Sequence, residues 1–244
     1  MKLKGLLLLA GNTARSQAYA QGMATTGYMP ENVIIYGPEK VNLPGQVDRV
    51  DSQRVGLDLF TPDLNIPLKE TCKKNRWPIN ILSCSNINDE EIVIAIKNIA
   101  PLLIVYSGYG GQLVGNRLLD LGIPFVHIYS GWLPGYRGST TLYYSWIKEN
   151  KCGASAIILS PVIDMGPIIA RKRYPPPTIG IDPDYIYDSS IRTDLLLKVL
   201  RYYSENGRLP EPVEQSESAK DKTYYVIHPV LKHLARLSNE EVIR

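Results

Sequence analysis

The chain has 244 residues, of which 44% are hydrophobic and 21% are charged. This length suits one domain with an extension, since domains commonly span about 100–200 residues, and the composition excludes a disordered or collagen-like chain. The net charge of +3 gives no support to a dedicated nucleic-acid-binding protein, in which basic residues are far more concentrated.

The three cysteines form no Cys-x-x-Cys pair. Their odd number disfavours a disulfide framework, and their spacing disfavours a zinc site, which together indicate a reducing compartment. The apolar run at 6–10 is shorter than the ~7–15 residues of a signal-peptide core, and no apolar stretch reaches the ~18 residues of a membrane span. We therefore expect a cytoplasmic protein with no metal and with neither a membrane nor a nucleic acid as partner.

Short apolar segments alternate with helical patterns through the first two thirds of the chain. Strands are expected at 6–10, 33–36, 79–82, 102–106, 125–128 and 154–159. Helices are expected at 16–27, 67–75, 89–99, 113–121 and 140–150. Asn88 is expected to cap the third of these helices. Residues 37–64, rich in Gly, Pro and Asp, are expected to form a loop that holds one short strand at most.

This alternation predicts right-handed β-α-β units and a Rossmann-like α/β fold, with a mostly parallel sheet covered by helices on both faces. The pattern ends after Tyr174, because the prolines at 175–177 cannot continue a helix or an interior strand. We expect a catalytic domain at 1–177 and a largely helical C-terminal extension at 178–244, with its main helix at 184–205.

Ligands of parallel sheets bind beyond the carboxyl ends of the strands, which directs attention to the loops that follow them. Asp164 lies between apolar residues and shortly before a glycine, a pattern typical of a partly buried acid at a strand end. The alternative is an aspartate that only stabilises the turn. His127 and Tyr129 are two positions apart at the end of one strand and so share a face, although His127 could equally be a structural histidine.

Two motifs in these loops resemble a known family. Leu-Pro-x-Tyr-Arg-Gly at 133–138, followed by Ile-Asp-x-Gly-Pro-Ile at 163–168, is similar to the 10-formyltetrahydrofolate-dependent formyltransferases. This family includes glycinamide-ribonucleotide, methionyl-tRNA and sugar N-formyltransferases. The resemblance covers 79–174 well and 1–40 more loosely. It implies a formyltransferase-like fold, with 10-formyltetrahydrofolate as the formyl donor.

The family's catalytic set is an Asn-x-His pair in the first loop and an aspartate in the second. With the Leu-Pro-x-Tyr-Arg-Gly motif aligned, His127 stands at the asparagine, Tyr129 at the histidine, and Ser130-Gly131 at a Pro-Ser pair. Only the aspartate, Asp164, is unchanged. A shift of two residues would place His127 on the family's histidine, but it would break the Leu-Pro alignment. The resemblance therefore implies a catalytic set of His127, Tyr129 and Asp164 in rearranged roles.

The resemblance also implies binding residues in the loops. In the family, backbone near the loop after 107 and near the Asp-Gly loop holds the pterin of the folate. The folate-binding residues expected here are Tyr109, Gln112, Leu113, Val114, Ile163 and Gly166. The substrate-binding residues expected are Asn12, Arg15, Tyr136 and Arg137.

Formyl transfer to an amine needs a donor for the oxyanion, a base for the amine proton and a path that returns a proton to the folate nitrogen. His127 could donate an N–H to the oxyanion. Tyr129, whose phenol has an ordinary pKa of ~10, is a better donor than base at neutral pH. Asp164 could raise the basicity of His127 or accept the proton through a water molecule.

The leading hypothesis is an N-formyltransferase for an amine of a small molecule, such as an amino sugar or a nucleotide sugar. The segment after the prolines is too short and too helical for the β-barrel RNA domain of methionyl-tRNA formyltransferases, and no phosphate site for glycinamide ribonucleotide is located. Two alternatives stay open: an enzyme of the same fold that uses His127 and Tyr129 for a changed reaction or donor, and a non-catalytic homologue that binds a ligand or partner. A homodimer is the assembly considered.

Overall fold

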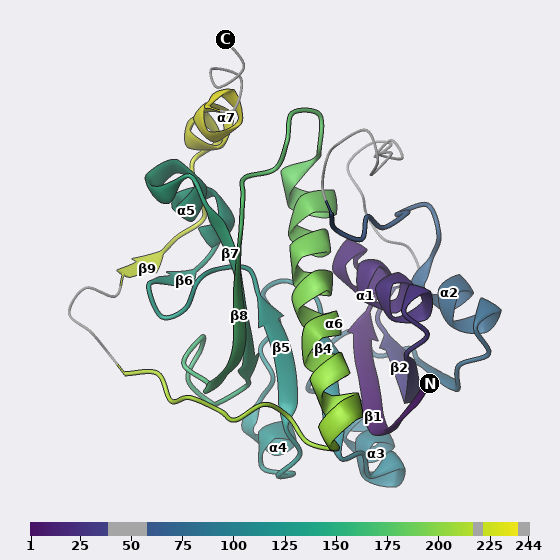
Figure 1. Ribbon diagram of the computed structural model, residues 1–244. Coiled ribbons are helices and arrows are strands. Elements are labelled where there is room, and N and C mark those ends of the chain that lie inside the picture. The colour runs from purple at the N-terminus through teal and green to yellow at the C-terminus, as the bar shows by residue number, and fades with distance from the viewer. Residues whose placement is uncertain (39–57, 217–221, 239–244) are drawn as a thin grey trace. The chain divides into compact units, whose positions relative to one another are not determined.

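The computed structural model describes residues 1–38, 58–216 and 222–238 (Figure 1). Seven strands of the described chain form a sheet in the order β3-β2-β1-β4-β5-β7-β8. The chain divides into two compact units. The described residues of the first unit are 1–38, 62–127 and 158–163, and those of the second are 58–61, 128–157, 164–216 and 222–238. The predicted α/β fold with a mostly parallel sheet is confirmed.

The first unit is built on parallel strands. These are β1 (Lys2–Gly11), β2 (Met29–Tyr36), β3 (Ile79–Leu82), β4 (Leu103–Ser107) and the start of β5 (Phe125–Tyr129). In β1, Leu6, Leu7, Leu8 and Leu9 have no exposed surface. The unbroken apolar run predicted this burial on both faces, which parallel strands between two helical layers require.

The described residues of the first unit form the helices α1 (Ala14–Thr25), α2 (Leu68–Lys74), α3 (Glu90–Ile99) and α4 (Asn116–Leu119). Ile92 and Ile96 of α3 pack with Leu7 and Leu9 of β1 in one hydrophobic cluster. The spacing of four between the two isoleucines places both side chains on the helix face that meets the sheet.

The prediction that Asn88 caps α3 is wrong. Asp89 is the N-cap residue, and its Oδ2 accepts hydrogen bonds of 3.1 Å from the backbone N–H groups at 85–86 rather than from the helix. Asn88 bonds instead to the loop before α4, where its Oδ1 accepts from Gly115 N at 2.7 Å and its Nδ2 donates to Leu113 O at 2.9 Å. This tertiary contact replaces local capping. The helix predicted at 113–121 is therefore shorter, since Gly115 precedes its first turn.

The second unit holds the remaining elements. They are β6 (Tyr136–Gly138), α5 (Thr141–Glu149), β7 (Cys152–Ile158), β8 (Ile168–Tyr174), the π-helical turn η1 (Pro183–Tyr187), α6 (Asp188–Asn206), β9 (Lys222–Tyr224) and α7 (Pro229–Leu237). Strand β8 runs antiparallel to β7 and was not predicted. It is the last strand of the sheet, and edge strands commonly carry exposed charges such as Arg171 and Lys172 that hide the apolar alternation.

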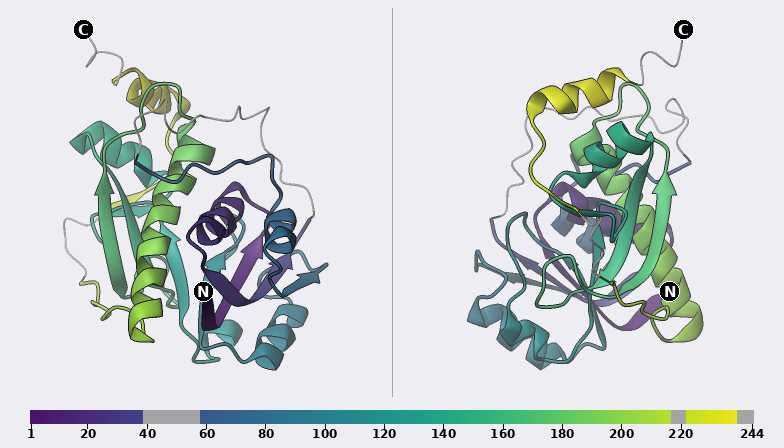
Figure 2. Two further views of the ribbon diagram at one scale, coloured as in Figure 1. Left: turned by 45° about the vertical axis from the view of Figure 1, so that its right-hand side comes forward. Right: turned by 90° about the vertical axis from the view of Figure 1, so that its left-hand side faces the viewer.

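The C-terminal segment returns to the Leu-Pro-x-Tyr-Arg-Gly motif. Strand β9 pairs in parallel with β6, and Gly138 lies opposite Tyr224. Helix α7 lies beside α5 in the views of Figures 1 and 2. The extension is largely helical, as predicted, and it contributes one strand that the sequence did not predict. The domain boundary after residue 177 stays a prediction.

Two expectations fall partly outside the described residues. The loop expected at 37–64 includes 39–57, and the C-terminal extension expected at 178–244 includes 217–221 and 239–244. None of the helices in the described ranges is long and apolar enough to cross a membrane.

Candidate active site

Gly138, the last residue of the Leu-Pro-x-Tyr-Arg-Gly motif, connects two of the predicted catalytic residues. Its N–H donates to Asp164 Oδ2 at 3.1 Å, and its carbonyl oxygen accepts from Tyr129 Oη at 2.8 Å. Its φ is +101°, and a Cβ at this position would lie 2.1 Å from the carbonyl oxygen of Tyr224. Only glycine fits here, because an L side chain would be both strained and in collision with β9.

Asp164 is partly buried, as its apolar neighbours predicted. Burial raises the pKa of the Asp164 carboxyl, while the Gly138 N–H and the guanidinium groups of Arg137 and Arg192 oppose this rise. The side chain of Gln215 fixes the loop, since its Nε2 donates to the carbonyl oxygen of Asp164 at 3.0 Å. The result is an acid held in one orientation beside the motif. Its catalytic role stays a prediction.

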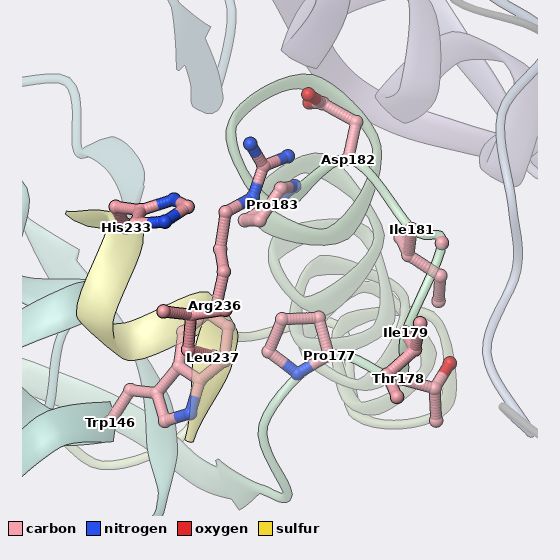
Figure 3. Close-up of a pocket in the computed structure, with 11 residues that line it drawn as sticks. Trp146, Pro177, Thr178, Ile179, Ile181, Asp182, Pro183, His233, Arg236 and Leu237 are labelled. Atoms are coloured by element: carbon pink, nitrogen blue, oxygen red, sulfur yellow. The ribbon is translucent and has the colours of Figure 1, made fainter. Parts of the chain in front are cut away.

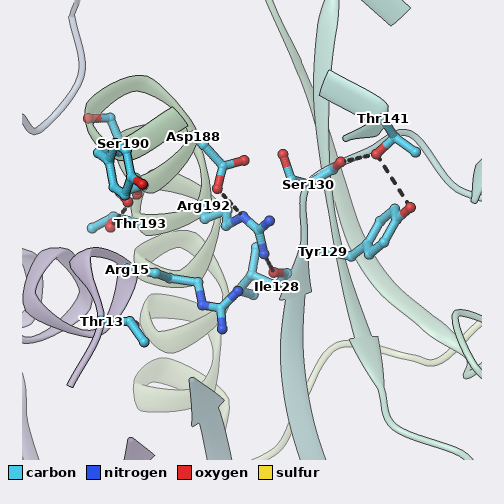
Figure 4. A network of polar contacts seen from close by, with 12 residues as sticks. Thr13, Arg15, Ile128, Tyr129, Ser130, Thr141, Asp188, Ser190, Arg192 and Thr193 are labelled. Carbon is cyan, nitrogen blue, oxygen red and sulfur yellow. Dashed lines mark hydrogen bonds and ion pairs between the residues drawn. The ribbon is translucent and has the colours of Figure 1, made fainter. Parts of the chain in front are cut away.

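Tyr129 is buried, with 7% of its surface exposed. Its one hydroxyl proton is donated to Gly138 O at 2.8 Å, and the Thr141 hydroxyl lies within hydrogen-bond distance of both Tyr129 Oη, at 3.3 Å, and the carbonyl oxygen of Ser130 (Figure 4). Burial raises the pKa of the Tyr129 phenol well above its ordinary value. Tyr129 is therefore no base at neutral pH, and it can donate to an oxyanion only by releasing Gly138.

Gly131 and Tyr129 are sterically linked. A Cβ at residue 131 would lie 2.6 Å from Tyr129 Cε1 and 2.6 Å from Thr141 Oγ1. The resembled family has histidine and serine at these two positions, and the larger tyrosine ring here occupies the space that a side chain at 131 would need. The departures at 129 and 131 therefore concern the same space, which Thr141 Oγ1 and the carbonyl oxygen of Tyr136 also border.

We expect Gly131→Ser to destabilise the chain strongly and to destabilise it less when Tyr129→His is present, because the collision with Thr141 Oγ1 remains. The coupling free energy of unfolding should be about 0.5–3 kcal/mol, the range for residues in contact. Denaturant unfolding of the two single variants and the double variant measures it. Additive effects of the two substitutions would show that the residues do not compete for the same space.

His127, the third predicted catalytic residue, belongs to the first unit. Its Nδ1 lies 3.4 Å from the carbonyl oxygen of Tyr106. A carbonyl oxygen only accepts, so in this contact Nδ1 is a ring nitrogen that carries a proton. The predicted contact of His127 with Tyr129 and Asp164 stays a prediction.

Two residues expected to bind folate, Tyr109 and Gln112, hold their own loop in place. Tyr109 Oη donates to Tyr36 O at 3.1 Å and accepts from Asn12 N at 3.0 Å. The Gln112 amide donates to Ser85 O at 2.8 Å and accepts from the Tyr36 hydroxyl at 3.2 Å. These side chains stabilise the loop whether or not its backbone binds a ligand.

The other expected folate-binding residues differ in exposure. Leu113 and Ile163 expose 56% and 60% of their surfaces, whereas Val114 packs against the core of the first unit and Gly166 is buried. The carbonyl oxygen of Gly166 accepts from Gln215 Nε2 at 2.7 Å. Exposed apolar side chains suit contact with an aromatic ligand, so Leu113 and Ile163 fit a folate best. All of these assignments stay predictions.

The four expected substrate-binding side chains also make contacts within the fold. In the first unit, Arg15 Nη2 donates to Gly108 O at 2.5 Å and Asn12 Nδ2 donates to Pro38 O at 2.7 Å. In the second unit, Tyr136 Oη donates to a carboxylate oxygen of Glu149 at 2.7 Å. Arg137 Nη2 donates to Gln215 Oε1 at 3.2 Å. Their substrate roles stay predictions.

Arg192 was not predicted as a site residue. Its Nε pairs with Asp188 Oδ2 at 2.8 Å and its Nη1 donates to Ile128 O at 2.8 Å (Figure 4), which joins α6 to the strand that carries Tyr129. The sequence contains one indication of this ion pair, because Asp188 and Arg192 are four positions apart on the predicted helix and so share one face of it. Nothing local indicated that the pair would lie near the motif.

The described part of the second unit contains cavities. One of about 190 Å³ is lined by Tyr129 and Gly138, among others. A larger one of about 400 Å³ lies between α5, α7 and the segment at 177–183, where Figure 3 shows the Arg236 side chain extending toward Asp182. None of the predicted site residues lines the larger cavity. Within 1–38, 58–216 and 222–238, no group of three or more His, Cys, Asp or Glu side chains could hold a metal ion.

Comparisons with known proteins identify related sequences. No family model matches the chain. It is 32% identical over 94 residues to the methionyl-tRNA formyltransferase of Finegoldia magna, a match that covers 38% of this chain and 30% of the relative. It is 26% identical over 200 residues to that of Clostridium acetobutylicum, covering 76% of this chain and 63% of the relative. The chain thus spans about a third to two thirds of the length of these relatives.

Solved structures share the fold. A phosphoribosylglycinamide formyltransferase from Anaplasma phagocytophilum superimposes with a TM-score of 0.58 at 13% identity, over 92% of this chain and 99% of that one. A methionyl-tRNA formyltransferase from Clostridium thermocellum does so with a TM-score of 0.53 at 14% identity, over 92% and 74%. The resemblance to the formyltransferase family that the two motifs predicted is confirmed in sequence and in fold.

Proposed function

We propose that this chain transfers a formyl group from 10-formyltetrahydrofolate to an amine of a small molecule, such as an amino sugar or a nucleotide sugar. The observation that carries the proposal is the contact between Asp164 Oδ2 and the Gly138 N–H. It joins the two motifs of the resemblance through the one catalytic residue of the family that this sequence keeps.

The proposed reaction begins with attack of the amine nitrogen on the formyl carbon. His127 Nε2 accepts the proton of the attacking amine, and the imidazolium so formed can donate to the oxyanion and then return a proton to the folate nitrogen as its bond to carbon breaks. The predicted contact with Asp164 would supply the negative charge that favours an imidazolium. Tyr129 holds the Gly138 carbonyl and positions the loop.

The formyl donor is proposed to bind at the loops that carry Leu113 and Ile163. These exposed apolar side chains offer contact area to the rings of a folate, while Tyr109 and Gln112 hold one of the loops from inside the fold. Pockets for such ligands are mostly apolar with few polar groups, which agrees with the exposed apolar side chains of Leu113 and Ile163.

A specific observation favours a second candidate, an enzyme of the same fold with a changed reaction or donor. The hydroxyl proton of Tyr129, which stands where the family has a histidine, is committed to Gly138 O. A site without that histidine lacks one of the family's proton-transfer groups. The two candidates differ in whether the chain binds the formyl donor.

We expect a folate analogue such as 10-formyl-5,8-dideazafolate to bind with a dissociation constant in the micromolar range, about −8 kcal/mol. Isothermal titration calorimetry measures it, with Leu113→Ala expected to weaken binding and Ile66→Ala, an exposed isoleucine outside the predicted site, to leave it unchanged. If no heat of binding is detected at a millimolar concentration of the analogue, 10-formyltetrahydrofolate is not the donor and the second candidate function is favoured.

A further inference from the structure

One residue that lines the cavity of about 190 Å³ carries a buried hydroxyl group without a partner. Ser130 lines this cavity and exposes 7% of its surface, and its Oγ has no hydrogen-bond partner. In Figure 4 the hydroxyl points toward the α6 side chains Asp188 and Arg192. A buried polar group without a hydrogen bond destabilises a fold, so such a group is expected to meet a ligand or a water molecule.

The sequence around Ser130 adds a second observation. In the resembled family a proline follows the histidine of the motif, and here a serine follows Tyr129. A proline could offer no hydrogen bond from its side chain or its nitrogen at this position. The replacement has therefore introduced a hydrogen-bonding group next to the residue that departs from the family's catalytic pair.

The walls of the cavity favour hydroxyl groups. Asp188 is paired with Arg192 at 2.8 Å, and Asp184 is paired with Lys232 at 2.8 Å. These two ion pairs carry no net charge that would attract either an ammonium group or a phosphate. Their carboxylate oxygens still accept hydrogen bonds from hydroxyl groups.

The size of the cavity limits the ligand further. Its volume is about 190 Å³. Pockets that enclose drug-sized ligands measure about 300–1,000 Å³, so this one suits a single small ring rather than a nucleotide. Tyr129 and Gly138 line the same cavity, and Gly138 N–H binds Asp164. A ring held here would lie beside Tyr129 and beside Gly138, the residue that binds Asp164.

We infer that this cavity binds a hydroxyl-bearing ring of the acceptor amine, an amino sugar, with the Ser130 hydroxyl as a hydrogen-bond partner that determines specificity. The inference rests on the proposed function. It narrows the acceptor to polyhydroxylated amines and adds Ser130 to the residues that bind it.

The test measures the direct binding of glucosamine and galactosamine by saturation-transfer NMR, in the absence of folate. We expect millimolar affinity in the wild-type chain and a loss of about 2- to 12-fold in Ser130→Ala, the range for one net hydrogen bond. Cyclohexylamine, a ring of the same size without hydroxyl groups, should bind more weakly and should not respond to the substitution.

The matched control is Ser190→Ala on α6. Ser190 is equally buried, but its hydroxyl donates to Ile186 O at 2.8 Å and it does not line the cavity. Sugar binding should be unchanged in this variant. The thermal stability of Ser130→Ala should equal or exceed that of the wild type, because the substitution removes an unsatisfied hydroxyl.

Equal sugar binding in the wild type and Ser130→Ala, or no sugar binding in the wild type, overturns the inference. Formyl transfer to an amino sugar is measured separately. Transfer that is insensitive to Ser130→Ala removes the cavity assignment and leaves the proposed reaction. Binding that depends on Ser130 without any transfer removes the reaction and leaves a sugar-binding cavity.

Discussion

Asp164→Asn is expected to reduce formyl transfer by about 10²–10⁴-fold, the usual effect of removing a group that assists proton transfer. Asparagine keeps the size of the side chain and an oxygen for the Gly138 N–H, and it tolerates the φ of +57° at this position better than most residues. Only the charge is lost. Steady-state kinetics of the two proteins with the same amine measures the effect.

The same substitution should leave the fold intact or stabilise it near neutral pH. Burial raises the pKa of the Asp164 carboxyl above its unfolded value, so the folded chain holds this proton more tightly than the unfolded chain. The Asp164 carboxyl contributes fully to stability when the pH is below its pKa in the unfolded chain. This contribution is lost as the pH rises through its higher pKa in the folded chain. Asparagine does not titrate, so the variant lacks this dependence of stability on pH. The free energy of unfolding of both proteins, measured at several pH values, tests this.

Activity should show the opposite dependence on pH. If the ionised carboxylate is required, the wild-type rate falls as the pH drops through the raised pKa of Asp164, and the residual rate of Asp164→Asn lacks this acid limb. Undiminished turnover in the variant would return Asp164 to the role of a turn residue.

Gly138→Ala is expected to destabilise the second unit and to abolish most of the activity. The new Cβ would collide with the Tyr224 carbonyl at 2.1 Å, and the φ of +101° adds backbone strain. Strain of this kind costs about 1–3 kcal/mol, and the loss of the β6–β9 contact adds to it. A shift of ~1 Å in the N–H that orients Asp164 can reduce a rate by about 10²-fold.

The matched control is Gly135→Ala in the same loop. There the nearest heavy atom to an added Cβ is the Trp132 carbonyl oxygen at 3.7 Å, an ordinary contact. Thermal unfolding and turnover of this variant should stay close to those of the wild type. If the two alanine variants behave alike, Gly138 is not the residue that links Asp164 to Tyr129.

Much of the fold could be predicted because its strands are apolar on both faces. An apolar run such as 6–10 is stable only when both faces of its sheet are covered, and it forms most of the C-terminal half of β1. Strand β8 could not be predicted in the same way, since Arg171 and Lys172 interrupt its apolar residues. The pairing of β6 with β9 joins segments far apart in the sequence, and no local pattern reports such a contact.

In the candidate site, too, some features could be predicted from the sequence and others could not. Asp164 could be found because a local motif surrounds it. The second hydrogen bond of Gly138, and the steric link between Tyr129 and Gly131, depend on distances across the fold that spacing does not encode. The unpaired Ser130 hydroxyl is likewise visible only once its surroundings are placed. Side chains expected to bind ligands, such as Gln112, turned out to hold their own loops.

The most direct test of the account is transfer of a labelled formyl group. The chain is incubated with 10-[¹³C]formyltetrahydrofolate and glucosamine, and the products are followed by NMR and mass spectrometry, with Asp164→Asn as the parallel sample. We expect a ¹³C-formamide on the sugar nitrogen, formed together with equimolar tetrahydrofolate, and we expect its formation to be about 10²–10⁴-fold slower in the variant. Unchanged donor in the presence of amino sugars and nucleotide sugars, despite folate binding, would contradict it.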